Sequence, residues 1–249
     1  MLLAIDIGNT NISFGIFKTN SIIKTFDIPS KQYSFNKFCK EIGSLKITDI
    51  FICSVVPELT KAVSKDLWRL SGKRPYIIGK DTPVPIQNCY RNPSQVGPDR
   101  LVNAYAGLIL YGAPLIVIDS GTAITFDVIS KRQAYLGGLI LPGLEISLAA
   151  LNEKTALLPQ IKLGYPKELI GGDTISSILS GVVIGSGALV NALAGRIKRK
   201  IGKSAQVIGT GGSIDLIKRY SELKLKIDRN LTLKGLNFIY KNEIKNHDH

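Results

Sequence analysis

Histidine is nearly missing from this chain. Its 249 residues include only His247 and His249, in a polar end that we expect to be frayed. Catalytic triads with histidine, Cys–His dyads, histidine-ligated metals and a histidine general base are therefore excluded. If the chain is an enzyme that needs a general base, a carboxylate is the leading candidate.

Cysteine is also scarce. Cys39, Cys53 and Cys89 are odd in number and widely separated, with no Cys-x-x-Cys pair. This pattern indicates neither a disulfide framework nor a zinc site, and it favours a reducing, cytoplasmic location. No signal peptide is expected, because Asp6 interrupts the apolar start almost at once.

Long hydrophobic runs are absent as well. The apolar stretch 108–118 is broken by Gly112 and Pro114, and the stretch 181–195 is short and rich in small residues. We therefore expect no membrane span.

The familiar nucleotide-binding motifs are missing. No Gly-x-x-x-x-Gly-Lys-Ser/Thr occurs, and the glycines of 209–212 do not have the spacing of the dinucleotide fingerprint. Any phosphate binding must therefore depend on other turns.

Acidic residues are outnumbered, and the formal net charge is +13. The basic residues are spread along the chain and concentrate only at 196–200 and 218–245, without the interleaved aromatic residues of a stacking platform. The pattern does not favour nucleic-acid binding, and anionic small substrates account for part of the charge.

One sequence motif, Asp-x-Gly after an apolar run, occurs twice. The first run ends in Asp6-Ile-Gly8-Asn9-Thr10 and the second in Asp119-Ser-Gly121-Thr122, at an offset of 119 − 6 = 113 residues. Each reads as a buried strand followed by a hairpin turn, with glycine for close backbone approach and short polar side chains for phosphate oxygens. The carboxylates can hold a cation, directly or through water. Two ordinary hairpins are the alternative for either turn alone, whereas the pair predicts a duplicated chain with a nucleotide site.

The hydrophobic pattern repeats in two halves, with a proline-containing loop at 82–98 as the plausible hinge. Antiparallel meanders followed by helices predict an α/β protein with residues 1–98 and 99–249 as two similar halves. We expect strands over 2–7, 12–17, 22–28, 50–55, 76–78, 115–119, 125–129, 134–140 and 207–209, and helices over 33–44, 58–71, 100–110, 145–152, 174–200, 214–220 and 236–241. The 174–200 helix, uncharged over 174–194, is either a core helix or a subunit contact.

Three further segments carry chemistry. In Gly97-Pro98-Asp99-Arg100, the carboxylate can accept a proton from a hydroxyl and the guanidinium can hold an anion; a helix cap with a solvated arginine is the alternative. The segment 137–143, Gly-Gly-Leu-Ile-Leu-Pro-Gly, is a turn that either passes a ligand closely or is only structural. The glycine turn 209–212 follows a strand and can accept adenine and ribose against its backbone.

Taken in order, these motifs resemble type III pantothenate kinase, a family of the superfamily that unites acetate kinase, sugar kinases, heat-shock chaperone ATPases and actin. The resemblance extends from residue 1 to about residue 240. It implies a duplicated ribonuclease-H-like (actin-like ATPase) fold with mixed sheets flanked by helices, and dimer-forming helices in the second half. It also implies ATP-dependent phosphorylation of the primary hydroxyl of pantothenate, the first step of coenzyme A biosynthesis. The implied cofactors are ATP with Mg²⁺ and a monovalent cation, K⁺ or NH₄⁺, and the implied partner is a second subunit near the active site.

The resemblance also implies roles for residues at matching positions. Asp99 resembles the catalytic base, and Asp119 resembles the ligand of the monovalent cation. Contacts to the substrate are implied for Tyr90, Gly97, Pro98, Arg100 and Thr174, the last reaching across the dimer. Contacts to ATP are implied for Asp6, Ile7, Gly8, Asn9, Thr10, Asn11, Ile12, Ser13 and Thr122.

Two other interpretations stay open. In the first, the chain is a kinase of the same fold that acts on another hydroxylated acid. In the second, it is a regulatory relative similar to the Bvg accessory factor, which is linked to transcription. Asp99, Arg100 and Asp119 argue against a loss of catalysis, and the positive charge argues weakly for a regulatory role.

Overall fold

The computed structural model describes residues 1–247, with side chains described for residues 1–243. The expected frayed end therefore falls partly outside it, since His249 and the side chain of His247 are not among the described residues. The contacts divide the chain into two compact units. The first comprises Met1–Ile86, Arg91–Ala106 and the chain from Asn230 onwards; the second comprises Gln87–Tyr90 and Gly107–Arg229.

The first unit is built on a five-stranded sheet of order β3-β2-β1-β4-β5. Its strands are β1 (Leu2–Ile7), β2 (Asn11–Lys18), β3 (Ser21–Pro29), β4 (Asp49–Ser54) and β5 (Tyr76–Ile77). The first three strands form an antiparallel meander, and β4 and β5 run parallel to β1. The meander expected from the sequence is thus confirmed.

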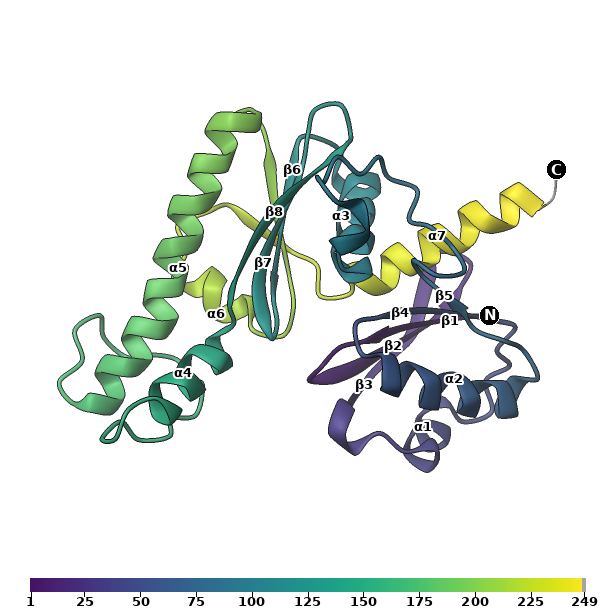
Figure 1. The fold of residues 1–249 in the computed structure, drawn as a ribbon, viewed down its shortest axis with the longest axis horizontal. Coiled ribbons are helices and arrows are strands. Elements are labelled where there is room, and N and C mark those ends of the chain that lie inside the picture. The colour runs from purple at the N-terminus through teal and green to yellow at the C-terminus, as the bar shows by residue number, and fades with distance from the viewer. Residues whose placement is uncertain (248–249) are drawn as a thin grey trace. The chain divides into compact units, whose positions relative to one another are not determined.

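Helices cover both faces of the first sheet (Figure 1). Leu3, Ile5 and Ile7 pack on the face covered by α1 (Phe35–Ile42) and α2 (Pro57–Ser71). Leu2 and Ala4 face the opposite way, towards the start of α3 (Pro98–Tyr111) and towards α7 (Leu231–His247). Because successive side chains of a strand point to opposite faces, the almost continuously apolar β1 is buried on both sides.

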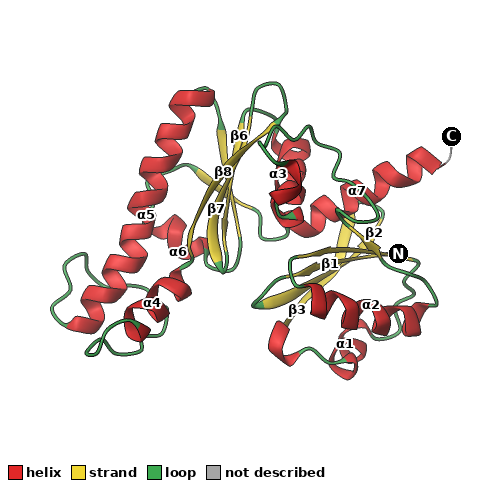
Figure 2. Ribbon diagram, viewed as in Figure 1, coloured by secondary structure: helices red, strands yellow, loops and turns green. Residues whose placement is uncertain are grey.

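The second unit repeats this sheet in the order β8-β7-β6-β9-β10. Its strands are β6 (Leu115–Ser120), β7 (Ala123–Ile129), β8 (Tyr135–Pro142), β9 (Gln206–Thr210) and β10 (Leu225–Ile227), and again three antiparallel strands are followed by two parallel ones. The helices α4 (Leu144–Glu153), α5 (Thr174–Ile201) and α6 (Ile214–Arg219) share a core with one face of this sheet (Figure 2). The same strand order in both units confirms the predicted duplicated ribonuclease-H-like fold.

The units interleave along the chain instead of meeting at one position. The expected boundary at 98/99 places α7 and all of α3 except Pro98 in the second half, whereas the contacts assign residues 98–106 and α7 to the first unit. Val102, Tyr105 and Leu236 belong to the same apolar cluster as Leu2 and Ala4, which explains that assignment. From Gly107 onwards, α3 belongs to the second unit, where a Cβ on Gly107 would lie 3.0 Å from Val117 Cγ2.

Each helix and strand expected from the sequence is present, with ends shifted by a few residues. The largest shifts are at α7, which was expected over 236–241 and extends from Leu231 to His247. The strand β10 was not predicted, because it has only three residues and a lysine in the middle.

The helix α5 bears on the expectation that no segment spans a membrane. The stretch 181–195 alone is too short to do so, whereas the whole helix of 28 residues is long and apolar enough by length and composition alone. This is weak evidence for a membrane, because core helices pass the same test. Val183, Val190 and Ala194 on α5 are buried in the core of the second unit, so the core-helix interpretation holds for this side of the helix.

Candidate active site

The first predicted phosphate turn joins β1 to β2 in the first unit. The Gly8 amide donates to the Asn11 carbonyl oxygen at 2.9 Å and closes the turn. Ser30 stabilises the turn with two hydrogen bonds: its hydroxyl donates to the Gly8 carbonyl oxygen at 2.7 Å, and its amide donates to the Thr10 carbonyl oxygen at 2.9 Å. Asn9 is exposed at the tip, as are the neighbouring Thr10 and Asn11. The turn therefore presents short polar side chains to solvent from a backbone that is fixed, as phosphate binding requires.

Asp6 is the penultimate residue of β1, the central strand of the first sheet, and is aligned with Ser13 of β2 and Cys53 of β4. The buried Cys53 thiol has its pKa raised by burial first, and then by the charges of Asp6 and Asp99. Both carboxylates are thus neighbours of one thiol at the end of β4. Sequence reasoning did not single out Cys53; the polar residues that end this parallel strand were the available signal.

Asp99 lies in the first turn of α3, on the same unit as Asp6. Burial raises the pKa of its carboxyl, although the Arg100 backbone amide and then the Arg100 charge act in the opposite direction. A Cβ at position 97 would collide with Asp99 Oδ1, so glycine is needed there to leave room for the carboxylate. The Gly97 carbonyl oxygen accepts the amide of Arg100 at 3.2 Å and fixes the start of the helix. The result is a partly buried carboxylate, with a raised pKa, beside a buried guanidinium.

The second predicted phosphate turn joins β6 to β7 in the second unit. Asp119 is aligned with Thr125 of β7 and Thr210 of β9, which matches the placement of Asp6 in the first sheet. The Gly121 amide donates to the Ala123 carbonyl oxygen at 3.0 Å and closes the turn. Both Asp-x-Gly sequences therefore end the central strand of a sheet, as the duplication predicts.

Two more glycine turns converge on the end of β6. The Gly143 amide donates to the Thr122 carbonyl oxygen at 3.1 Å, and a Cβ on Gly143 would lie only 2.8 Å from the Thr122 carbonyl carbon. Gly211, with φ +91°, packs against Asp119 Oδ1, and a Cβ there would be 2.6 Å from the Ser120 carbonyl oxygen. Three segments separated in sequence thus meet around Asp119, each with a glycine at the point of contact.

The remaining predicted residues lie elsewhere. Tyr90 belongs to the second unit and packs on β8, with its ring against Gly137 and near Tyr135. Thr174 is the first residue of α5 and is exposed, next to the helix cap formed by Asp173 and Ser176. The structure therefore groups Asp6, Gly97, Pro98, Asp99 and Arg100 in one unit, and Tyr90, Asp119, Thr122 and Thr174 in the other.

The donor set fits oxygen-binding cations. Among residues with described side chains, no group of three or more His, Cys, Asp or Glu is placed to hold a metal ion. Mg²⁺ in phosphoryl-transfer enzymes is commonly held by one or two carboxylates together with substrate phosphates and water. Asp6 matches that pattern, and Asp119 with the nearby carbonyl oxygen of Ser120 offers oxygen ligands for a second cation.

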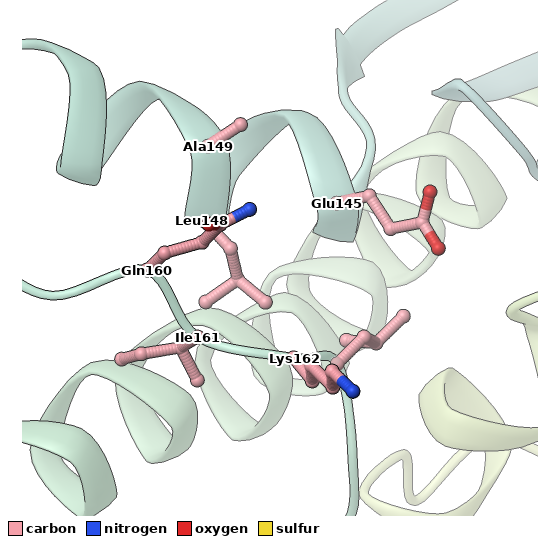
Figure 3. A pocket seen from close by; sticks show the side chains of 7 residues that line it. Glu145, Leu148, Ala149, Gln160, Ile161 and Lys162 are labelled. Atoms are coloured by element: carbon pink, nitrogen blue, oxygen red, sulfur yellow. The ribbon is translucent and has the colours of Figure 1, made fainter.

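A separate hollow of about 400 Å³ lies in the second unit between α4 and residues 160–163. Leu148, Ile161 and Leu163 give it an apolar lining, and Glu145 points away from the facing segment (Figure 3). It contains none of the predicted site residues.

Comparison with solved structures supports the fold. The chain matches a conserved Baf-family protein from Campylobacter jejuni with a TM-score of 0.62 and 21% identity, covering 98% of this chain and 99% of the other. It matches component A of the (R)-2-hydroxyglutaryl-CoA dehydratase of Acidaminococcus fermentans with a TM-score of 0.56 and 12% identity, covering 98% of each. The likeness defines the class of fold: a duplicated ribonuclease-H-like (actin-like) architecture, in which each unit carries an Asp-x-Gly turn after the central strand of its sheet.

Sequence comparison then identifies the family. The type III pantothenate kinase family model matches residues 2–196. The type III pantothenate kinase of Persephonella marina is 39% identical over 250 residues, covering 96% of this chain and 98% of the relative. The chain belongs to the type III pantothenate kinase family. It is accordingly a kinase that uses ATP with a divalent cation.

Proposed function

We propose that this protein transfers the γ-phosphoryl group of ATP to the primary hydroxyl of pantothenate. The products are 4'-phosphopantothenate and ADP, in the first step of coenzyme A biosynthesis, and the location is the cytoplasm. The observation that carries the catalytic assignment is the partly buried carboxylate of Asp99, which has a raised pKa and for which the missing side chain of Gly97 leaves room.

In this mechanism, Asp99 accepts the proton of the attacking hydroxyl. The hydroxyl oxygen forms a bond to the γ-phosphorus while the bond from that phosphorus to the ADP oxygen breaks, and the proton passes to Asp99. A raised pKa suits a carboxylate that must hold this proton, because general-base catalysis is most efficient when the pKa is near the working pH. The Arg100 guanidinium supplies a fixed positive charge for the carboxylate of pantothenate.

Phosphoryl transfer depends mainly on positioning and electrostatic stabilisation. The turn from Asp6 to Ser13 binds the triphosphate through exposed amides and hydroxyls, and Thr122 adds a further ATP contact. Asp119 holds a monovalent cation, K⁺ or NH₄⁺. The cations, when bound, neutralise charge that develops on the phosphates.

The other substrate contacts are Tyr90, Gly97, Pro98 and Thr174. We propose that the protein is a homodimer in which Thr174 reaches the substrate of the partner subunit. The exposure of Thr174 and of the apolar Ile175 beside it, at the start of α5, supports this arrangement.

The direct test is ADP release from purified protein with ATP and Mg²⁺, with pantothenate or other hydroxylated acids, in potassium, ammonium or sodium salts. We expect release that requires pantothenate and is stimulated by potassium or ammonium. If ADP is released with a different acid and not with pantothenate, that acid is the substrate instead. Equal turnover in sodium would contradict the monovalent cation site.

A second prediction concerns pH. Asp99 must be ionised to accept a proton, so kcat/KM should fall as the pH decreases through the raised pKa of this carboxyl. The acid limb is therefore expected above the ordinary aspartate pKa of about 3.9. The measurement is kcat/KM against pH, with circular dichroism at each pH to verify folding. A level profile down to about pH 4 would contradict the assignment of Asp99 as the base.

A further inference from the structure

A fully buried carboxylate lies in the second unit away from the phosphate turn. Asp127 in β7 is 0% exposed and accepts a hydrogen bond from the Tyr135 hydroxyl at 2.8 Å; the Thr125 hydroxyl approaches its other oxygen at 3.4 Å. Tyr135, in β8, is also 0% exposed. A buried charge is costly unless it is hydrogen-bonded, and removing one partner is strongly destabilising. The Asp127–Tyr135 pair therefore fixes the Tyr135 side chain firmly.

Tyr135 in turn holds the segment Gln87–Tyr90. The Tyr135 amide donates to the Gln87 carbonyl oxygen at 2.8 Å, and its own carbonyl oxygen accepts the Cys89 amide at 2.9 Å. These two bonds attach the segment to the edge of the second sheet through a parallel bridge between Asn88 and Tyr135. They explain why four residues of a long loop belong to this unit.

The ring of Tyr90 contacts two positions of β8. Its centroid is 6.5 Å from that of Tyr135, with the ring planes tilted by 38°. The backbone of Gly137 leaves space for the ring: a Cβ there would lie 3.0 Å from Tyr90 Cδ2 and 3.1 Å from Cε2. Gly137 has φ +106°, which favours glycine independently. Asn88 Oδ1 also accepts the Tyr90 amide at 3.0 Å.

We propose that Asp127 and Tyr135 are positioning residues for Tyr90. The inference rests on the proposed function, in which Tyr90 contacts pantothenate. The chain of contacts runs from the buried Asp127 carboxylate to the Tyr135 hydroxyl, and from the Tyr135 ring and backbone to Tyr90. It orders the Tyr90 ring before the substrate arrives, so that binding does not have to restrict its rotamers.

The first test is Tyr135→Phe, which removes the hydroxyl and keeps the ring. We expect KM for pantothenate to rise about 2- to 10-fold, the range that corresponds to ordering one side chain on binding. The values of kcat and of KM for ATP should stay close to those of the wild type. Tyr111→Phe is the matched control, because it breaks the 3.0 Å hydrogen bond from the Tyr111 hydroxyl to Asp228 in the same unit. The control should lose stability without a change in KM for pantothenate.

A double-mutant cycle separates positioning from a general structural effect. In a Tyr90→Ala background, Tyr135→Phe should have no further effect on KM for pantothenate, because the side chain it orders is gone. Asp127→Asn keeps an oxygen that accepts the Tyr135 hydroxyl and should give a smaller increase in KM than Asp127→Ala. An equal increase from Tyr135→Phe in both backgrounds, or no increase in either, would overturn the proposal.

Hydrogen exchange without substrate distinguishes failure of this inference from failure of the proposed function. In Tyr135→Phe, the amides of residues 87–90 should exchange faster than in the wild type and in Tyr111→Phe. If the wild type does not phosphorylate pantothenate, the proposed function fails even when exchange is faster. If exchange at these amides is unchanged, the positioning role fails whatever the substrate is.

Discussion

Asp99→Asn is expected to lower turnover with pantothenate by about 100- to 10,000-fold, the usual contribution of a general base. Asparagine has nearly the same shape and keeps an oxygen for the Arg100 amide, but it cannot accept the proton of the attacking hydroxyl. ATP binding should persist, because the Asp6 turn is closed and braced by its own hydrogen bonds and by Ser30. The measurements are kcat from ADP release and the Kd for ATP from calorimetry.

Stability provides an internal check on Asp99→Asn. Burial raises the pKa of Asp99, so the folded protein binds this proton more tightly than the unfolded chain does. The resulting contribution to the free energy of unfolding is fully present below the unfolded pKa, and it is lost as the pH rises through the folded pKa. At neutral pH the ionised carboxylate therefore destabilises the fold, and Asp99→Asn should have a higher Tm than the wild type.

The control is Asp49→Asn, at the start of β4, the strand that ends near Cys53. Asp49 Oδ2 accepts hydrogen bonds from Tyr240 at 2.9 Å and from Thr48 at 2.7 Å, and the amide of asparagine retains an oxygen for them. Its turnover should be near that of the wild type. Near-normal turnover in Asp99→Asn would contradict the base assignment, and a low Tm with lost ATP binding would show misfolding instead.

The sequence predicted the elements well where apolar periodicity was strong. The strand Leu2–Ile7 was predicted with its observed ends, because it is apolar up to the Asp6 turn and buried on both sides. The strand β10 was missed since three residues around an exposed lysine give no period. The length of α7 was underestimated because Lys234 and Gly235 interrupt its apolar pattern, although Leu231, Leu233 and Leu236 are all buried.

The Asp-x-Gly turns could be located from the sequence because turn chemistry is local, but the residues that pack near them could not. The spacing of the motifs indicated Asp6, Asp119 and the glycine turns. The two Asp-x-Gly turns are alike because Asp6 and Asp119 occupy equivalent register positions in the two sheets. Long-range packing determined the rest: Cys53 reaches the carboxylates only because β4 pairs in parallel with β1. Likewise, Tyr90 belongs with β8 because of backbone bonds between residues 87–89 and Tyr135, more than forty positions apart, which no local pattern signals.

Gly211→Ala is expected to reduce turnover by about 100-fold, the cost associated with moving catalytic groups by about 1 Å. Gly211 has φ +91°, where an L side chain is strained, and its Cβ would strike Asp119 Oδ1. The Asp119 carboxylate or the glycine turn must then shift, which should weaken activation by potassium or ammonium as well as ATP binding. The strained backbone should also lower the free energy of unfolding by roughly 1–3 kcal/mol.

The neighbouring glycine supplies a matched control for this last prediction. Gly212 has no positive φ, and a Cβ there would meet no atom within 4 Å. Gly212→Ala should therefore keep near-normal cation activation and Tm, although it lies in the same turn. The measurements are kcat, the concentration of potassium for half-maximal activation, and Tm for both variants. Equal losses in the two would mean that the turn tolerates no side chain at all, whereas wild-type cation activation in Gly211→Ala would contradict the role of Asp119 as the ligand. A selective loss in Gly211→Ala follows only if the contact between Gly211 and Asp119 positions that carboxylate.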